Sequence, residues 1–236
     1  MFENIPNHGD ISKGTKKAVT KKTHLLNTAL TLFQEKGYQE TTMRDIAKHG
    51  NVGLGTAYYY FKGKNEIVFA FYQDSLGQTL AYTDIIFSSK NSIECKLDEF
   101  FDKKFEEMKP YRGFLKAIAA SSFDSNNPIS PLNSANKEVK DQVMSRIQQL
   151  FEDEKVKMGK DIRPIIGSLV WHLHMALLLY WIYDRSENQE NTAKLKQKTL
   201  SLMFTFLGLS KLPIIRGFNK VFVDILITIE ALHDHG

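Results

Sequence analysis

The chain contains only one cysteine, Cys95, among its 236 residues. A single thiol cannot close an intrachain disulfide, which excludes the disulfide-stapled class of secreted domains. The same count excludes a four-cysteine zinc site. Because cysteines are kept reduced in the cytosol, this usage favours a cytoplasmic protein.

Long hydrophobic runs are also lacking. The most apolar stretch, residues 170–183, has 14 residues and includes two histidines, whereas a membrane span needs roughly 20 predominantly apolar residues. The first 20 residues are polar and hold no apolar core of signal-peptide length. We therefore predict a soluble protein without a membrane partner, in which residues 170–183 belong to a buried helix.

Signatures of catalysis are missing as well. The sequence has no Gly-rich phosphate loop, no nucleophile elbow and no zinc-ligand spacing. His172 and His174 are two residues apart and point to different sides of a helix, so they are poor joint metal ligands. The prediction is a protein that is not an enzyme, with no catalytic residues, no metal and no cofactor.

The charge is unevenly distributed along the chain. With 25% charged and 42% hydrophobic residues the composition is that of an ordinary globular protein, in one large domain or two smaller ones. Residues 1–64 hold ten Lys and Arg against five Asp and Glu, while the remainder holds 21 against 22. A basic first quarter can attract a polyanion, or it can be a solvated tail. Charge alone leaves both readings open.

Helical periodicity dominates the sequence. Apolar residues recur at three- and four-residue spacing over 20–36, where Gly37 supplies a stop. Thr42, followed three residues later by Asp45, predicts a capped second helix that ends near Gly50-Asn51. Gly53 is a permissive N-cap for a third helix over 54–61. Further helices are expected at 65–87, 92–108, 110–123, 131–157, 162–184, 192–208 and 213–232, with a loop at 124–130, so the fold class is all-α.

The second and third helices, joined by a tight turn, form a helix-turn-helix, a unit whose second helix fits the major groove of DNA. Ala47 and Val52 are expected to face inward where these two helices meet. Across 41–48 (TTMRDIAK), 52–61 (VGLGTAYYYF) and 62–66 (KGKNE) the sequence resembles the TetR family of bacterial regulators. The resemblance covers about residues 25–68 and keeps the family's register without a gap. It departs at Gly50-Asn51, where the family has Ala-Gly, and at Gly53, where it has a serine.

The resemblance implies a two-domain organisation. We expect a flexible basic arm over 1–19, a helix-turn-helix DNA-binding domain over 20–64, and a helical effector-binding and dimerisation domain over 65–236. The partners implied are double-stranded DNA, a small apolar effector and a second copy of the chain.

Resemblance and side-chain chemistry together assign the DNA-binding residues. Arg44 is the candidate for a bidentate contact with guanine. Leu54 can pack against a thymine methyl group, and Gly55 permits close approach of the helix to DNA. The hydroxyls of the threonines and tyrosines can contact phosphates or base edges, and Lys64 can neutralise a phosphate. Three consecutive tyrosines on a helix cannot all face DNA, and any of them can instead pack; Tyr58 and Tyr60 are favoured over Tyr59 as DNA contacts. The full set is Thr42, Arg44, Leu54, Gly55, Thr56, Tyr58, Tyr59, Tyr60 and Lys64.

The larger domain has the aromatic and methionine side chains to surround an apolar ligand, although such side chains also serve as ordinary core. The helices over 162–184 and 192–208 are apolar enough to meet a second subunit; the alternative is a monomer that buries both against 213–232. The candidate ligand-binding residues are Phe105, Met108, Phe123, Trp171, His174 and Leu178.

The expected function is a homodimeric regulator that binds a palindromic operator and is released by a small, largely apolar molecule. A repressor is favoured over an activator. A helical enzyme, or an adaptor module without sequence-specific DNA binding, is the alternative.

Overall fold

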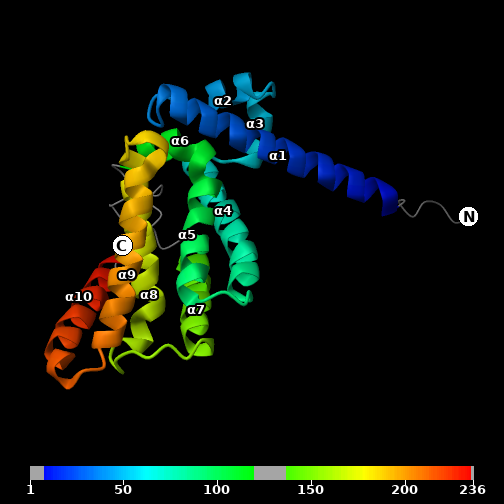
Figure 1. Ribbon diagram of the computed structural model, residues 1–236. Coiled ribbons are helices and arrows are strands. Elements are labelled where there is room, and N and C mark those ends of the chain that lie inside the picture. The colour runs from blue at the N-terminus through cyan, green and yellow to red at the C-terminus, as the bar shows by residue number, and fades with distance from the viewer. Residues whose placement is uncertain (1–7, 120–136, 235–236) are drawn as a thin grey trace, which may run out of the picture. The chain divides into compact units, whose positions relative to one another are not determined.

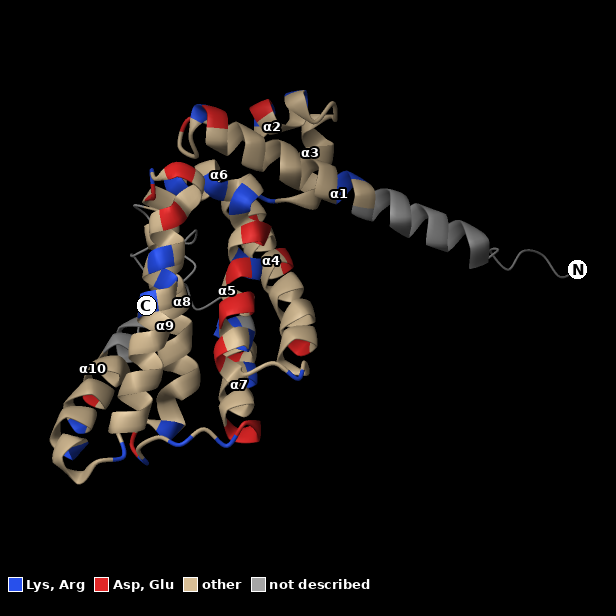
Figure 2. Cartoon of the chain, in the orientation of Figure 1, with Lys and Arg blue, Asp and Glu red and all other residues tan. Residues whose placement is uncertain are grey.

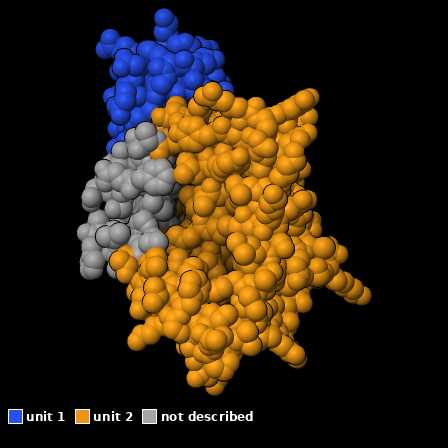
Figure 3. All heavy atoms as spheres, turned by 60° about the vertical axis from the view of Figure 1, so that its left-hand side comes forward, with its two compact units in different colours: residues 1–71 blue, residues 72–236 orange. Residues whose placement is uncertain are grey.

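The structure is a computed structural model that describes residues 8–119 and 137–234. Within these ranges the ordered elements are helices, and no strand occurs. The expected all-α class is therefore confirmed. The chain divides into two compact units, residues 1–71 and residues 72–236 (Figures 1 and 3). The expected loop at 124–130 and the candidate Phe123 lie outside the described residues.

The first unit is built around three helices, α1 (His8–Lys36), α2 (Met43–His49) and α3 (Leu54–Tyr60). Its core is formed by fully buried side chains from all three helices and from the residue that ends α3. Gly37 takes a φ of 92° and its amide donates to the Phe33 carbonyl at 3.1 Å, which ends α1 where the sequence predicts. The members of this core include Leu25, Ala29, Phe33, Ile46 and Phe61.

Two boundaries differ from the sequence-based expectation. Helix α1 begins at His8, so residues 8–19, expected as a flexible arm, are helical. The prediction was wrong because it required apolar periodicity, whereas a polar segment can extend a helix that packing has already nucleated. The unit boundary falls at Phe71/Tyr72 and not at 64/65, because the first turns of α4 (Lys64–Phe87) supply Ile67 and Val68 to the buried set.

In its described residues the second unit contains the rest of α4 and six further α-helices. Short 3₁₀ turns at Lys109–Tyr111, Arg163–Ile165 and Pro213–Ile215 each carry a proline at their start and lead directly into α6, α8 and α10. The helix expected over 110–123 is such a turn followed by α6. The helices are α5 (Ile93–Met108), α6 (Arg112–Ile118), α7 (Lys137–Asp153), α8 (Ile166–Tyr183), α9 (Glu190–Leu209) and α10 (Arg216–Asp234).

Helix α8 lies at the centre of this unit and carries no Lys, Arg, Asp or Glu. It packs against α5, α6, α7 and α9. By length and composition the segment Arg163–Tyr183 could cross a membrane, but more than half of it is buried inside the unit. A helix without charged side chains that packs against four neighbouring helices is the core helix of this domain.

The turn between α8 and α9 is held by one buried carboxylate. Asp184 accepts hydrogen bonds from the amide and hydroxyl of Ser186 (2.9 and 2.7 Å) and from those of Thr192 (2.8 and 2.6 Å). Desolvation raises the pKa of Asp184, but these four hydrogen bonds outweigh it and hold the pKa well below its usual range. The carboxylate thus fixes the direction in which α9 leaves α8.

Helices α7 and α8 approach each other closely at Gly167, and this contact yields a first prediction. A Cβ on Gly167 would clash with the Met144 carbonyl and lie 3.3 Å from Gln148. Because a backbone carbonyl cannot swing away, we expect Gly167→Ala to lower the free energy of unfolding by about 1–3 kcal/mol, as overpacking does. Denaturant unfolding measures the change.

Gly208→Ala on α9 is the matched control, because a Cβ there meets no atom within 4 Å. It should be neutral or stabilise the protein by up to about 1 kcal/mol through helix propensity. Equal unfolding energies for the two variants would contradict the close approach of α7 and α8.

Candidate nucleic-acid interface

Helices α2 and α3 meet across a tight turn. The Val52 amide donates to the Ala47 carbonyl at 3.0 Å, and Asn51 takes a φ of 51°. Gly50 adopts an ordinary helical φ, but a Cβ there would lie 2.9 Å from Leu25 and 3.0 Å from the Ile46 carbonyl. The absence of a side chain at Gly50 therefore lets Leu25 of α1 pack closely against this turn. Ala47 is buried and Val52 half-buried, as the helix-turn-helix prediction expects.

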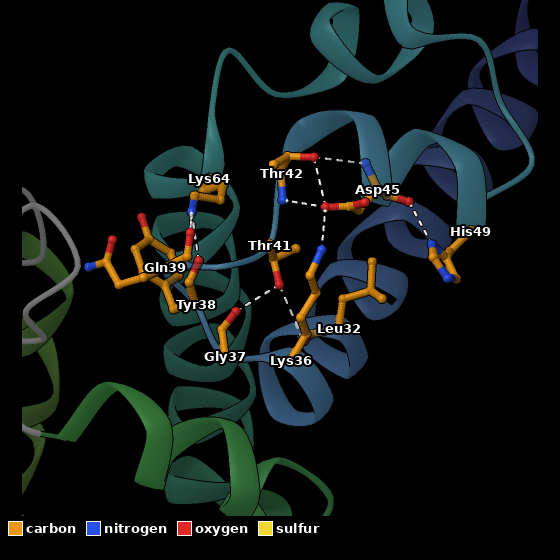
Figure 4. A network of polar contacts seen from close by, with 10 residues as sticks. All are labelled: Leu32, Lys36, Gly37, Tyr38, Gln39, Thr41, Thr42, Asp45, His49 and Lys64. Atoms are coloured by element: carbon orange, nitrogen blue, oxygen red, sulfur yellow. Dashed lines mark hydrogen bonds and ion pairs between the residues drawn. The ribbon is translucent and has the colours of Figure 1, made fainter.

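A capping box opens α2, as the sequence predicts. The Thr42 hydroxyl accepts from the Asp45 amide at 3.1 Å, and Asp45 accepts from the Thr42 amide at 2.9 Å and from its hydroxyl at 2.7 Å (Figure 4). Lys36, in the last turn of α1, also binds the Asp45 carboxylate at 3.0 Å. Hydrogen bonds from Thr42 first, and from Lys36 second, hold the pKa of Asp45 well below its usual range. This network joins α1 to the start of α2.

Two further side chains secure the loop between α1 and α2. Buried Thr41 donates to the Gly37 carbonyl at 2.7 Å. Lys64 donates to the carbonyls of Tyr38 and Gln39 at 2.6 and 3.0 Å, and its ammonium lies 4.6 Å from the centre of the Tyr38 ring (Figure 4). Burial lowers the pKa of Lys64. The sequence assigned Lys64 to a phosphate, whereas here its donors are directed to the protein backbone.

Helix α3 presents one face to solvent. Leu54, Tyr58 and Tyr59 are 38%, 44% and 75% exposed, and a Cβ on Gly55 would meet nothing within 4 Å. Thr56 and Tyr60 are half-buried, and the Tyr60 ring meets the Tyr59 ring edge-on at 5.1 Å. Of the three tyrosines, Tyr58 and Tyr59 are therefore the accessible ones, whereas the sequence favoured Tyr58 and Tyr60. The opposite face is closed by buried Ala57.

Exposed basic side chains accompany this face. Arg44 and Lys48 lie on α2, and Lys62 follows α3; all three are exposed. Lys22 on α1 is exposed too and lies 5.5 Å from the centre of the Phe61 ring. The first unit thus combines an exposed helix face with nearby cations, which is the arrangement that attracts and reads a nucleic acid.

The candidate ligand residues are distributed over the second unit. Trp171 belongs to the main hydrophobic cluster of this unit, and half-buried Phe105 packs against that cluster. Trp171 also meets the buried His174 ring at 5.6 Å. Met108 and Leu178 are buried, but within the described residues they are not members of that cluster. The structure thus brings Trp171 and His174 into direct contact, whereas the Phe105 ring stacks on Trp181 at 5.7 Å.

Sequence reasoning missed a buried polar group beside this cluster. The ammonium of Lys104 on α5 binds Ser75 and Thr79 on α4 and Glu107 on α5. The only sequence signal for this group is the four-residue spacing of Ser75 and Thr79, which places two hydroxyls on one side of a helix.

A helix-turn-helix unit followed by a separate helical bundle defines a class of two-domain DNA-binding regulators. Known proteins identify the family. The profile of bacterial regulatory proteins of the tetR family matches residues 25–71, and the profile of the tetracyclin repressor-like C-terminal domain matches residues 96–222. The chain belongs to the TetR family and is a transcriptional regulator with a DNA-binding helix-turn-helix.

Individual relatives agree with this assignment. The biofilm operon negative transcriptional regulator IcaR of Staphylococcus aureus is 26% identical over 199 residues, which cover 79% of this chain and 98% of IcaR. The transcriptional repressor KstR2 of Mycobacterium tuberculosis is 33% identical over 91 residues, covering 38% of this chain and 45% of KstR2.

Solved structures share the fold. The fatty acid degradation regulator FadR from Bacillus halodurans superposes with a TM-score of 0.63 at 18% identity, over 76% of this chain and 94% of FadR. FadR from Bacillus subtilis, solved in complex with stearoyl-CoA, gives a TM-score of 0.60 at 18% identity, over 78% and 98% of the two chains.

The capping box on α2 generates a prediction about stability. We expect Thr42→Ala to lower the free energy of unfolding of the first unit by about 1 kcal/mol, because the Asp45 amide loses its acceptor. Thr42→Ser keeps the hydroxyl and should stay near wild type. Denaturant unfolding followed by circular dichroism provides the measurement.

Thr31→Ala serves as the control, since its exposed hydroxyl only bonds back to the Asn27 carbonyl within α1.

Asp45 yields a prediction about pH. Because folding lowers the pKa of Asp45, the carboxylate stabilises the folded state above the unfolded-state pKa, and this stabilisation is lost as the pH falls through the folded-state pKa. Asp45→Asn should therefore weaken the acid sensitivity of the unit; unchanged acid sensitivity would contradict the role of this carboxylate.

Proposed function

We propose that the protein is a cytoplasmic repressor that binds a palindromic operator as a homodimer and is released by a small, largely apolar effector. The observation that carries the proposal is the exposed face of α3, on which Leu54, Gly55, Tyr58 and Tyr59 are accessible while Ala57 is buried. A helix with one face held by its own domain and the other free is suited to lie in a major groove.

In the proposed complex α3 reads the bases. Leu54 packs against thymine methyl groups, Gly55 allows the helix to approach closely, and Tyr58 and Tyr59 supply hydroxyls to phosphates or base edges. Arg44, exposed on α2, makes a bidentate contact with guanine. Thr56 and Tyr60, both half-buried, contribute at the margin of this face.

Thr42 and Lys64 act in this proposal by shaping the site and not by contacting phosphates. The Thr42 hydroxyl is engaged with Asp45, and the Lys64 ammonium with the carbonyls of Tyr38 and Gln39. Both side chains fix the loop that leads into α2, and α2 in turn supports α3.

A second copy of the chain is the proposed partner for the apolar side chains exposed on α9 and α10. Thr199–Leu209, the second half of α9, carries no charge, and charged residues are correspondingly sparse there in Figure 2. Leu202 on α9 and Phe218 on α10 are 68% and 61% exposed. Helix α8, which the sequence suggested as a dimer helix together with α9, is buried on one side and exposes Ala176, Tyr180 and Tyr183 along the other. A two-fold dimer matches a palindromic operator.

Release by an effector follows from population shift: a ligand that binds better to the conformation with low DNA affinity empties the operator. Relatives support both the repressor role and the binding of an effector. IcaR is named a negative regulator, KstR2 a repressor, and FadR of Bacillus subtilis was solved with stearoyl-CoA. Phe105, Met108, Trp171 and Leu178 remain candidates for the apolar contacts.

Arg44 tests sequence-specific binding. The partner DNA is first selected from a random duplex library with the wild-type protein. We expect Arg44→Ala to reduce the preference for the selected duplex over a scrambled one by about 1–3 kcal/mol, because a guanine contact is lost. Fluorescence anisotropy at fixed salt concentration measures both affinities.

Lys48→Ala, on the same helix, is the control. Because Lys48 is an exposed cation, this change should weaken binding to both duplexes alike. It should also lower the slope of log affinity against log salt by about 1, as the loss of a phosphate contact does. Equal weakening of both duplexes by Arg44→Ala would overturn its proposed role in base recognition.

Leu202 tests the dimer. We expect Leu202→Glu to shift the protein from dimer to monomer, because a carboxylate buried in an apolar interface is not compensated. Gln197→Glu places the same side chain at another exposed position of α9 and should leave the dimer intact. Sedimentation velocity distinguishes the two species, and a wild-type protein that sediments as a monomer would exclude the proposed dimer.

A further inference from the structure

A lysine buried in the second unit has all its donors satisfied. The Lys104 ammonium donates to the hydroxyls of Ser75 and Thr79 at 2.7 and 2.9 Å, and to both carboxylate oxygens of Glu107 at 3.2 Å. Lys104 and Glu107 are both largely buried. One anion therefore already balances this one cation, and the three hydrogen atoms of the ammonium have partners.

A histidine close to this pair has no hydrogen-bond partner among the described residues. His174 on α8 is 1% exposed, and within the described residues neither Nδ1 nor Nε2 has a hydrogen-bond partner. Its ring stacks on Phe101 at 5.7 Å and meets Phe100 and Trp171 edge-on at 5.6 Å each. Buried polar groups are nearly always hydrogen-bonded, so an imidazole enclosed by aromatic rings without a partner calls for a functional explanation.

The imidazole is held in its neutral form. Burial, and to a lesser degree the charge of Lys104, lowers the pKa of His174 to about 3. A neutral imidazole offers one N–H donor and one nitrogen acceptor. A hydroxyl group is complementary to it, because it can donate to the bare nitrogen or accept from the N–H.

We propose that His174 is the hydrogen-bonding anchor of the effector site, and that the effector is an uncharged, largely apolar molecule bearing a hydroxyl group. Phe100, Phe101 and Trp171 supply the faces for its apolar part. The site depends on the proposed function in assuming that this helical domain is the one that receives the effector.

The charge balance of the site favours a neutral effector over an acid. An effector carboxylate would enter a region where Lys104 is already neutralised by Glu107, and a second buried anion would have no counter-charge of its own. The neutral imidazole provides none either. A hydroxyl brings no charge and satisfies the group that lacks a partner.

Access to His174 links binding to conformation. Because the imidazole is 1% exposed, an effector reaches it only when the surrounding rings on α5 and α8 move. Binding therefore selects a conformation in which these two helices pack differently, which is the kind of two-state element that release from DNA needs.

Three probes of similar size and different polar groups test the proposal: 2-naphthol, naphthalene and 2-naphthoate. Equilibrium dialysis against the full-length protein gives their dissociation constants. We expect 2-naphthol to bind about tenfold more tightly than naphthalene, as one additional buried hydrogen bond provides, and 2-naphthoate to bind most weakly. His174→Phe should make 2-naphthol and naphthalene bind equally.

His172→Phe is the matched control, because His172 is half-buried two residues away and its Nδ1 lies 2.9 Å from the Ser168 carbonyl. It should leave the preference for 2-naphthol unchanged. His174→Phe should also raise the midpoint of thermal unfolding, since it replaces an unsatisfied polar ring with an apolar one. If His174→Phe does not fold, His174→Leu repeats the comparison.

Four results would overturn the proposal: tighter binding of 2-naphthoate than of 2-naphthol, an unchanged preference in His174→Phe, loss of the preference in His172→Phe, or no binding of any probe. The same preparation is tested for binding to the selected duplex. A preserved preference for 2-naphthol in a protein that binds no DNA specifically would sink the regulator function and leave the site standing. A protein that binds DNA specifically but shows no preference for 2-naphthol would overturn the His174 site and leave the regulator function standing.

Discussion

The burial of one whole face of α8, a helix without a charged side chain, is the constraint on which the second unit depends. A helix of 18 residues without a charged side chain is unstable in water unless neighbours cover it. Helices α5, α6, α7 and α9 provide that cover, and the close contact with α7 at Gly167 shows how little space is left between backbones. The same enclosure places His174 among aromatic rings, so the feature that stabilises the domain also creates its one buried imidazole without a partner in the described part of the chain.

Buried polar groups then determine which neighbour lies where. An apolar helix can slide against its neighbours at little energetic cost, whereas a buried charge is stable only beside its own counter-charge. Lys196 on α9 reaches Asp98 and Asp102 on α5 at 2.7 and 2.6 Å, and Lys104 on α5 reaches Ser75 and Thr79 on α4. These contacts fix the registers of α9 and α4 against α5, and Asp184 fixes the turn before α9.

Local signals were sufficient for most helix ends and insufficient for the partners of buried and charged side chains. Thr42, Asp45, Gly37 and Gly53 act within a few residues of their positions, so the sequence predicts the helix ends that they determine. Long-range geometry was not accessible in this way. Lys64 donates to the Tyr38 carbonyl, and Lys104 on α5 binds Ser75 on α4. Both contacts join residues that are distant in the sequence, and periodicity cannot pair such residues. The start of α1 was missed because a polar helix has no apolar signature.

Helix α4 begins in the first unit and continues into the second. Near its start, Lys64 donates to the Tyr38 carbonyl in the loop that leads into α2. Further along the helix, Thr79 accepts a hydrogen bond from Lys104 on α5. Lys104 lies about one turn from Phe101, whose ring stacks on His174. An effector can shift an equilibrium only by its differential affinity for two conformations. A hydroxyl that satisfies His174 in a rearranged packing of α5 and α8 would supply that difference.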